Sequence, residues 1–362
     1  MIQDAVNVAQ LQEFDEIVDV RSPSEYKHDH IPGAINCPVL SDEERARVGT
    51  LHARESAFAA RRVGAALVSR NIAAHLETVF ADKPRKWRPL IYCWRGGQRS
   101  GSMTIVLRQA GWDAKRLEGG YKAFRRFVVS DIARLSELFR FQVVCGLTGS
   151  GKSALLRELQ LQDAQVLDLE GLARHRGSVL GNLPSSGQPG QKMFDSRIWE
   201  TLSGFDPERP VYVEAESRKI GNLRVPEPLM NAMRGSACLL LQASMLARIQ
   251  LLIREYQHFI GDPAVLCAGL DALSWLHGRS RVAHWKQLAL QGDWTTLVRE
   301  LLENHYDPAY RKSSDLNYTR LSEATSLPVA EGNEQEFTAI AGKLRSREQA
   351  LPGTPAIAET RV

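Results

Sequence analysis

Short apolar runs alternate with longer amphipathic stretches through the first part of the chain. The runs at 17–20, 89–92 and 115–117 have the length and composition of buried strands. Between and after them, the stretches 58–80 and 121–138 repeat their apolar residues with helical spacing, and 102–110 does the same. Strands that alternate with helices in this way predict an α/β layer structure.

The same alternation resumes after residue 140. An apolar run at 141–145 is followed at 154–159 by a stretch with helical spacing. Further strands are predicted at 166–169, 211–213 and 238–241. From residue 244 to residue 304 the pattern is mostly helical, and we expect its apolar stripe to pack into a core.

These patterns predict two α/β domains of ordinary size. The first covers residues 1–135, and the second covers 136–350 with a helical part near 244–304. Residues 351–362 contain two prolines and small side chains, so we expect a flexible tail.

Composition narrows the class of protein. Of the 362 residues, 43% are hydrophobic and 24% charged, which is the balance of a folded globular protein. No run of about 18 apolar residues and no leader pattern is present, so we expect a cytoplasmic protein with no membrane association. The 5 cysteines are scattered without a C-x-x-C pair, which argues against a disulfide framework and a zinc site. One reactive thiol among structural ones is the better expectation.

Positive residues cluster although the formal net charge is only +4. One cluster surrounds Trp87 within residues 83–88, and another surrounds Trp285. Basic side chains beside aromatic rings suit RNA, and solvated helix faces are the common alternative. The candidate RNA-binding residues of the second cluster are Arg279, Arg281, His284 and Lys286.

The candidate reactive thiol is Cys93, in the segment YCWRGGQRS at residues 92–100. The cysteine follows a predicted strand, and two glycines lead into a predicted helix. Backbone N–H groups in such a turn, together with the helix N-terminus, form a cradle for an anion and stabilise a thiolate. Arg95 and Arg99 add positive charge, so we predict a pKa for Cys93 below the free-thiol value of about 8.5.

A phosphate-binding loop is predicted at residues 146–153, with the sequence GLTGSGKS. The pattern G-x-x-x-x-G-K-[ST] stands in its required context, after an apolar strand and before a helix. Backbone amides of such a loop bind phosphate oxygens, Lys152 neutralises phosphate charge, and Ser153 is placed to bind Mg²⁺. The glycines of this loop are Gly146, Gly149 and Gly151.

An acidic partner for this loop is expected at the end of a neighbouring strand. Glu214 and Glu216 follow the apolar run at 211–213 and are the favoured candidates. Asp168, which follows the apolar residues 166–167, is the competing candidate. Acidic residues after apolar strands also cap helices and form turns, so the pattern alone does not decide between them.

Four motifs in order resemble the rhodanese family: DVRSPSEY at 19–26, HIPGAIN at 30–36, the Cys93 loop, and LEGGY at 117–121. The resemblance implies a cysteine that accepts sulfur or selenium and passes it on. Ordinary sulfur-transferring rhodaneses carry four residues between the cysteine and the loop arginine, whereas five residues separate Cys93 from Arg99. The longer loop makes a wider cradle, so a phosphorylated donor such as selenophosphate fits as well as thiosulfate.

The whole arrangement resembles the tRNA 2-selenouridine synthase family. The resemblance rests on the rhodanese-like segment, the P-loop, LDLEGLARHRGS at 167–178 and EAESRKIG at 214–221. It implies a rhodanese-like α/β domain and a P-loop NTPase-like α/β domain with a helical extension. It further implies that 2-thiouridine at the tRNA wobble position is S-geranylated with geranyl diphosphate and then converted to 2-selenouridine with selenophosphate.

In this resemblance Cys93 carries selenium, with Arg95 and Arg99 beside it, and an enzyme that supplies selenophosphate is an expected partner. The residues leave open whether the P-loop holds geranyl diphosphate, selenophosphate or a nucleotide. The alternative is a sulfurtransferase coupled to an ATP-hydrolysing P-loop domain, and turnover of ATP without tRNA would distinguish it.

Overall fold

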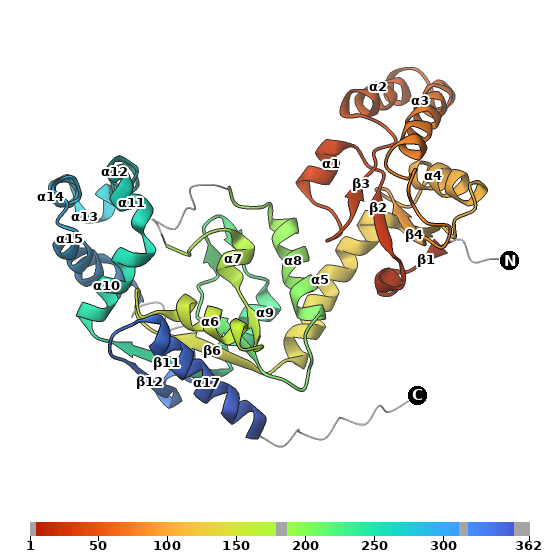
Figure 1. Cartoon of the computed structure of the whole chain (residues 1–362). Helices are drawn as coiled ribbons and strands as arrows, with labels where there is room; N and C mark the ends of the chain where they lie inside the picture. The colour runs from red at the N-terminus through yellow and green to blue at the C-terminus, as the bar shows by residue number, and fades with distance from the viewer. Residues whose placement is uncertain (1–4, 179–186, 311–317, 351–362) are drawn as a thin grey trace. The chain divides into compact units, whose positions relative to one another are not determined.

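The computed structural model describes residues 5–178, 187–310 and 318–350 (Figure 1). The tail predicted at 351–362 lies outside these residues. Contacts divide the chain into two compact units, one formed by Met1–Asp131 with Gly190–Glu200 and the other by Ile132–Pro189 with Thr201–Val362.

The first unit is built on a five-stranded parallel sheet with the strand order β1-β5-β4-β2-β3. The strands are β1 (Ala5–Val6), β2 (Glu16–Asp19), β3 (Ile35–Asn36), β4 (Pro89–Tyr92) and β5 (Lys115–Leu117). The helices are α1 (Pro23–His28), α2 (Asp42–Arg54), α3 (Ala57–Glu77), α4 (Gln98–Gln109) and α5 (Gly120–Leu138). β4 lies in the middle of the sheet, so Cys93 follows a central strand whose four residues are all buried.

The DVR motif at the end of β2 forms a buried ion pair beneath the cysteine loop. Asp19 accepts hydrogen bonds from Arg21 Nε at 3.0 Å and from the Tyr92 hydroxyl at 2.6 Å. The guanidinium of Arg21 lies 4.0 Å from the centroid of the Tyr121 ring, and the Arg21 side chain is only 1% exposed. A buried pair satisfied on both sides fixes the ends of β2 and β4 against α5.

The helix α8 (Gln191–Ser203) contributes residues 190–200 to the first unit, although it follows the P-loop in the sequence. Arg125 on α5 donates hydrogen bonds to Asp195 Oδ2 at 2.9 Å and to Ser196 Oγ at 2.7 Å. The indole of Trp199 donates to Asp131 at 2.9 Å. These bonds attach α8 to α5.

The second unit has another parallel five-stranded sheet, ordered β12-β11-β6-β8-β7. Its strands are β6 (Phe141–Cys145), β7 (Gln165–Leu167), β8 (Val211–Glu214), β11 (Ala237–Ala243) and β12 (Thr325–Val329). A small antiparallel pair joins β9 (Lys219–Ile220) to β10 (Leu223–Arg224). Among its helices are α6 (Lys152–Leu161), α7 (Leu169–Ala173), α9 (Glu227–Arg234) and α17 (Glu334–Ala350). The sheets confirm the predicted α/β class.

The predicted helical part of the second unit is confirmed as a set of short helices. They are α10 (Met245–Glu255), α11 (Gln257–Gly261), α12 (Pro263–Asp271), α13 (Ser274–His277), α14 (Arg279–Gln291), α15 (Trp294–Leu301) and the π-helical turn Leu302–Tyr306. They enclose their own apolar core, in which Trp285 is fully buried. Among the described residues, no helix is both long and apolar enough to span a bilayer.

Candidate active sites

The thiol of Cys93 lies at the bottom of the loop between β4 and α4. Its sulfur is 3.2 Å from Ser100 Oγ and accepts a hydrogen bond from the backbone N–H of Gly97 at 3.3 Å. Gly97 caps the N-terminus of α4, so the positive end of the helix is directed at the sulfur. The loop thus has the predicted form of an anion cradle.

The environment of Cys93 favours its thiolate. Burial alone would raise the pKa of this thiol, which is 3% exposed, but hydrogen bonds from Ser100 and from the Arg95 backbone, with the charge of Arg99, lower it below the ordinary value. The predicted direction is therefore confirmed. Its main causes are the hydroxyl and the amides, and the arginine charge contributes less.

The LEGGY motif packs directly against this loop. The backbone N–H of Tyr121 donates to the Cys93 carbonyl at 2.9 Å. Gly120 has a φ of +57°, and a Cβ there would stand 2.3 Å from the same carbonyl oxygen. Only glycine meets both conditions, so the motif supports the floor of the cysteine loop.

The two arginines of the loop have different positions. Arg99 forms an ion pair with Glu25 of α1 at 2.7 Å, so part of its charge is neutralised. The Glu25 carboxylate also accepts from the backbone N–H of Ser22, which ties α1 to the loop. Arg95 is exposed. Its side chain is therefore the freer of the two to meet an anionic donor.

The phosphate loop joins β6 to α6 in the second unit. Lys152 Nζ donates a hydrogen bond to the Gly146 carbonyl at 3.0 Å and lies 3.4 Å from a carboxylate oxygen of Glu214. The Ser153 hydroxyl donates to the other oxygen of Glu214 at 3.0 Å. Gly146, Gly149 and Gly151 all have positive φ, which gives the loop its tight curvature.

Two residues distant in sequence hold this loop from outside. The hydroxyl of Tyr310 accepts a hydrogen bond from the Gly146 N–H at 2.9 Å. Arg248 Nε donates to the Thr148 carbonyl at 2.8 Å, while its terminal nitrogens donate to Asp307. Neither was a candidate from the sequence, because nothing in their local sequence indicates contact with the loop.

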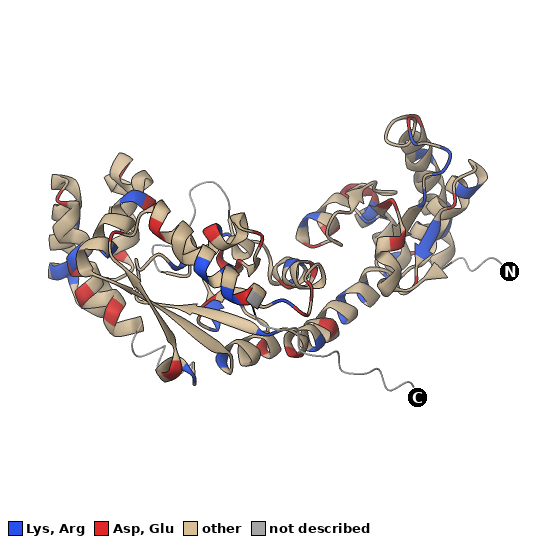
Figure 2. Ribbon diagram, turned by 60° about the horizontal axis from the view of Figure 1, so that its bottom comes forward, with Lys and Arg blue, Asp and Glu red and all other residues tan. Residues whose placement is uncertain are grey.

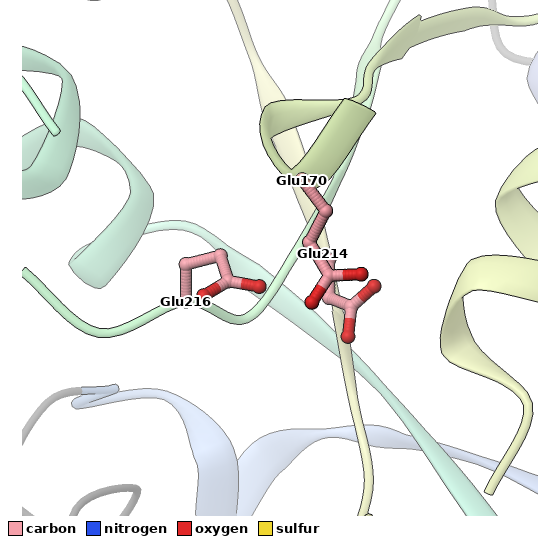
Figure 3. Close-up of side chains that lie close together, drawn as sticks. All are labelled: Glu170, Glu214 and Glu216. Carbon is pink, nitrogen blue, oxygen red and sulfur yellow. The ribbon is translucent and has the colours of Figure 1, made fainter. Parts of the chain in front are cut away.

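Three carboxylates gather beside the loop (Figure 3). Glu214 ends β8, Glu216 lies just beyond it, and Glu170 belongs to α7. One oxygen of each lies within 4.8 Å of the others. The sequence predicted Glu214 and Glu216 as the acidic partners, and the structure places both here.

The competing candidate Asp168 is not one of the three carboxylates, and Glu170 is the third. Asp168 instead caps α7, accepting a hydrogen bond from the Gly171 N–H at 2.8 Å. Glu170 was missed, although it lies in the LDLEGLARHRGS stretch. Gly177, at the end of that stretch, has a φ of +65°, and a Cβ there would stand 3.1 Å from the Glu170 carboxylate. The motif therefore shapes the wall of the acidic group.

Crowding of these carboxylates perturbs their protonation. Burial, followed by the charges of Glu214 and Glu216, raises the pKa of Glu170 to about 10. Burial and Glu214 raise the pKa of Glu216 well above its usual range. Burial would lower the pKa of Lys152, but the surrounding acids raise it, so this lysine is charged. The group therefore carries extra protons or takes up a cation.

Oxygen ligands are those that Mg²⁺ prefers, and the group fits such an ion chemically. Ser153 with Glu214 and Glu216 would hold it, with Glu170 as the further carboxylate.

A cavity of about 660 Å³ opens from the phosphate loop into the helical part of the second unit. At one end it is lined by Lys152, Ser153 and the three glutamates. Beyond the loop, the helices line it mainly with apolar residues, namely Ile253, Phe259, Ile260, Leu266, Trp294, Leu297, Val298, Leu301 and Leu302, together with Glu255, Tyr256, His305 and Tyr306. An anion-binding end and an apolar end thus share one cavity.

The predicted RNA-binding cluster lies on α14. Arg279 and Arg281 are exposed, whereas Lys286 forms an ion pair with Asp271 and His284 lies 3.2 Å from Glu300. Trp285 is buried and donates to Glu300 at 2.9 Å, so its ring is not a stacking surface. Over the described residues, basic and acidic side chains are largely interspersed (Figure 2).

Two sequence-family profiles match the chain. Residues 4–127 match the rhodanese-like domain, and residues 139–269 match the AAA domain of tRNA 2-selenouridine synthase. The first match includes the Cys93 loop, and the second includes the phosphate loop and the three glutamates.

Several curated relatives are similar to the chain over much of its length. A tRNA 2-selenouridine synthase of Nitrosomonas europaea is 36% identical over 66% of this chain and 63% of its own length, slightly under two thirds of that protein. The tRNA 2-selenouridine synthase of Marinobacter nauticus is 35% identical over 81% of this chain and 87% of its own. That of Aeromonas salmonicida is 32% identical over 81% of this chain and 86% of its own.

Proposed function

The chain belongs to the tRNA 2-selenouridine synthase family, and from this premise we propose that it converts 2-thiouridine at the tRNA wobble position to 2-selenouridine. The proposed route passes through S-geranyl-2-thiouridine, with geranyl diphosphate as the alkyl donor and selenophosphate as the selenium donor. In this account the enzyme is a transferase with two reactive loops, one in each unit.

The observation that carries the proposal is the cavity of the second unit, because its two ends match the two ends of a prenyl diphosphate. The loop amides, Lys152 and Ser153 suit a diphosphate. The apolar walls suit a ten-carbon hydrocarbon chain, since each buried CH₂ contributes roughly 0.8 kcal/mol. Apolar side chains outnumber polar ones in the part of the lining that the helices contribute, which favours a hydrocarbon chain over a nucleotide base.

In the first step the sulfur of 2-thiouridine attacks the allylic carbon of the donor, and the carbon–oxygen bond to diphosphate breaks. The diphosphate leaves with the electron pair, and the base loses its N3 proton. Lys152 and the loop amides stabilise the charge that develops on the leaving group. Mg²⁺, when bound, would supply further positive charge there.

In the second step selenium is delivered to C2 of the base. Alkylation has made the sulfur a leaving group, so geranyl thiolate departs with the electrons of the carbon–sulfur bond. A perselenide on Cys93 would need an oxidant to form from selenophosphate, so we assign Cys93 a step without redox change: its thiolate, which the hydrogen bonds favour, attacks C2 as geranyl thiolate leaves. The selenium of selenophosphate then attacks C2 and displaces the Cys93 thiolate. Water takes up the phosphoryl group, so that phosphate and 2-selenouridine are released. The exposed Arg95 and the helix N-terminus favour an anionic selenium donor at this loop.

Ligand affinities test the assignment of the cavity. Calorimetry with Mg²⁺ should show geranyl diphosphate binding at least about a hundredfold more tightly than inorganic diphosphate, since the prenyl chain buries apolar surface. ATP should not be hydrolysed in the absence of tRNA. Equal affinities for the two diphosphates, together with ATP turnover, would favour the alternative of a sulfurtransferase coupled to an ATPase.

A further inference from the structure

The helices α2 and α3 form a hairpin in the first unit, between β3 and β4 (Figure 1). The buried residues of the hairpin all come from α3, and α2 has none among its 13 residues. The two helices meet where α3 has Gly64, since a Cβ there would be 3.5 Å from Val48 of α2. The outer faces of both helices are therefore exposed.

Positive charge is concentrated on the part of this hairpin nearer its turn. The hairpin, residues 42–77, contains six arginines and five acidic residues, a net charge of +1. Four of the acidic residues stand at its open end, at 42–44 and 77, so residues 45–70 contain the six arginines and a single glutamate. All of these arginines are exposed, namely Arg45, Arg47, Arg54, Arg61, Arg62 and Arg70.

None of these six guanidinium groups has an ion-pair partner in the part of the chain that the structure describes. Cationic residues elsewhere are often paired, as Lys83 is with Glu16 at 2.7 Å and Lys286 is with Asp271. Unpaired positive charges repel one another, so the turn end of the hairpin, with Arg54, Arg61 and Arg62, is electrostatically complementary to an anionic ligand.

An aromatic ring lies among these charges. Phe58 is 76% exposed in the first turn of α3. Arg61 and Arg62 follow it by three and four positions, so their side chains share its face of the helix. Arg54 ends α2 just before the turn that leads to α3. An exposed ring flanked by arginines suits an unpaired base with its adjoining phosphates better than it suits an acidic protein surface.

We propose that the outer face of the α2–α3 hairpin is an RNA-binding surface, in which Arg54, Arg61 and Arg62 contact phosphates and Phe58 stacks on an unpaired base. This inference rests on the proposed function, which supplies tRNA as the substrate. It assigns RNA contacts to the unit that carries Cys93, at residues outside the clusters near Trp87 and Trp285.

The test is a salt titration of tRNA binding to the full-length protein, measured by fluorescence anisotropy. For R61Q/R62Q we expect a log–log salt slope shallower by about 2 and at least about tenfold weaker binding at low salt. K343Q/R347Q, which removes the same charge from exposed positions of α17, should bind like the wild type. R61K/R62K should have the same salt slope as the wild type. F58A should weaken binding about tenfold and leave the salt slope unchanged.

An R61Q/R62Q protein that binds as K343Q/R347Q does would overturn the proposal, while salt-dependent binding by the wild type would leave the proposed function intact. A wild-type protein that binds no tRNA would contradict both. Thermal unfolding of each variant controls for folding, and these exposed positions should leave it unchanged.

Discussion

The ammonium group of Lys152 lies 3.4 Å from the carboxylate of Glu214. Both side chains are nearly buried, with 11% and 10% of their surfaces exposed. A bound diphosphate would interact with the lysine, and a bound divalent cation would interact with the carboxylate. The ion pair therefore keeps both charges positioned in the phosphate site before ligands bind.

Lys152→Ala should lower the rate of geranyl transfer by about 10²–10³-fold, because a cation is lost from the leaving diphosphate. Selenation of tRNA that already carries the geranyl group should survive better. The exposed Lys219→Ala is a matched control. Failure of the Lys152 variant on pre-geranylated tRNA as well would show that the loop serves both steps or maintains the fold.

The reactivity of Cys93 should depend on pH in a defined direction. Since its pKa is lowered, the rate of alkylation by a small reagent should rise with pH and level off below the pH expected for a free thiol. Ser100→Ala removes the hydroxyl that stands 3.2 Å from the sulfur and should move the midpoint to higher pH. Labelling in a Cys267→Ser background, with Cys93→Ser as the blank, isolates this thiol. An unchanged midpoint would exclude Ser100 as a cause.

A bulky side chain at the apolar end of the cavity should weaken binding of the prenyl chain without weakening binding of the diphosphate. Ile253→Trp places a larger side chain on the cavity wall. It should weaken the binding of geranyl diphosphate at least about tenfold, because the ring takes up space that the hydrocarbon chain would occupy. Binding of inorganic diphosphate should be retained. Leu246→Trp, on the exposed side of the same helix, is the control. Equal losses for both diphosphates would place the prenyl chain elsewhere.

The contacts between α8 and α5 should contribute measurably to the free energy of unfolding. Asp29 is fully buried 3.8 Å from Arg125, which also binds Asp195. Arg125→Ala leaves both acids without their cation and should lower the free energy of unfolding by about 3 kcal/mol. Lys122→Ala, at an exposed position of the same helix, should change it little. Identical denaturant midpoints for the two variants would contradict this account of α8.

Much of the molecule could be predicted because its signals are local. The phosphate loop, the strand before it and the helix after it lie within about twenty residues, so spacing alone identifies them. The same holds for the loop of Cys93 after β4. The parallel sheets follow from the alternation of strands and helices.

The parts that could not be predicted depend on contacts between distant segments. Glu170 joins Glu214 only because the sheet order places β7 beside β8. Arg248 and Tyr310 reach the phosphate loop from about a hundred residues or more away in sequence, and α8 returns to the first unit after the P-loop. Clusters of basic residues in the sequence do not reveal which charges are free. Lys286 and His284 have acidic partners, Asp271 and Glu300, that the sequence pattern did not indicate.

Mass spectrometry of tRNA nucleosides tests the division of labour between the two loops most directly. Thiolated tRNA would be incubated with geranyl diphosphate, selenophosphate and either the wild-type protein or Cys93→Ser. The account predicts 2-selenouridine from the wild type, and S-geranyl-2-thiouridine without selenium from the variant. Loss of both products in a folded Cys93→Ser protein would contradict it, as would formation of 2-selenouridine by that variant.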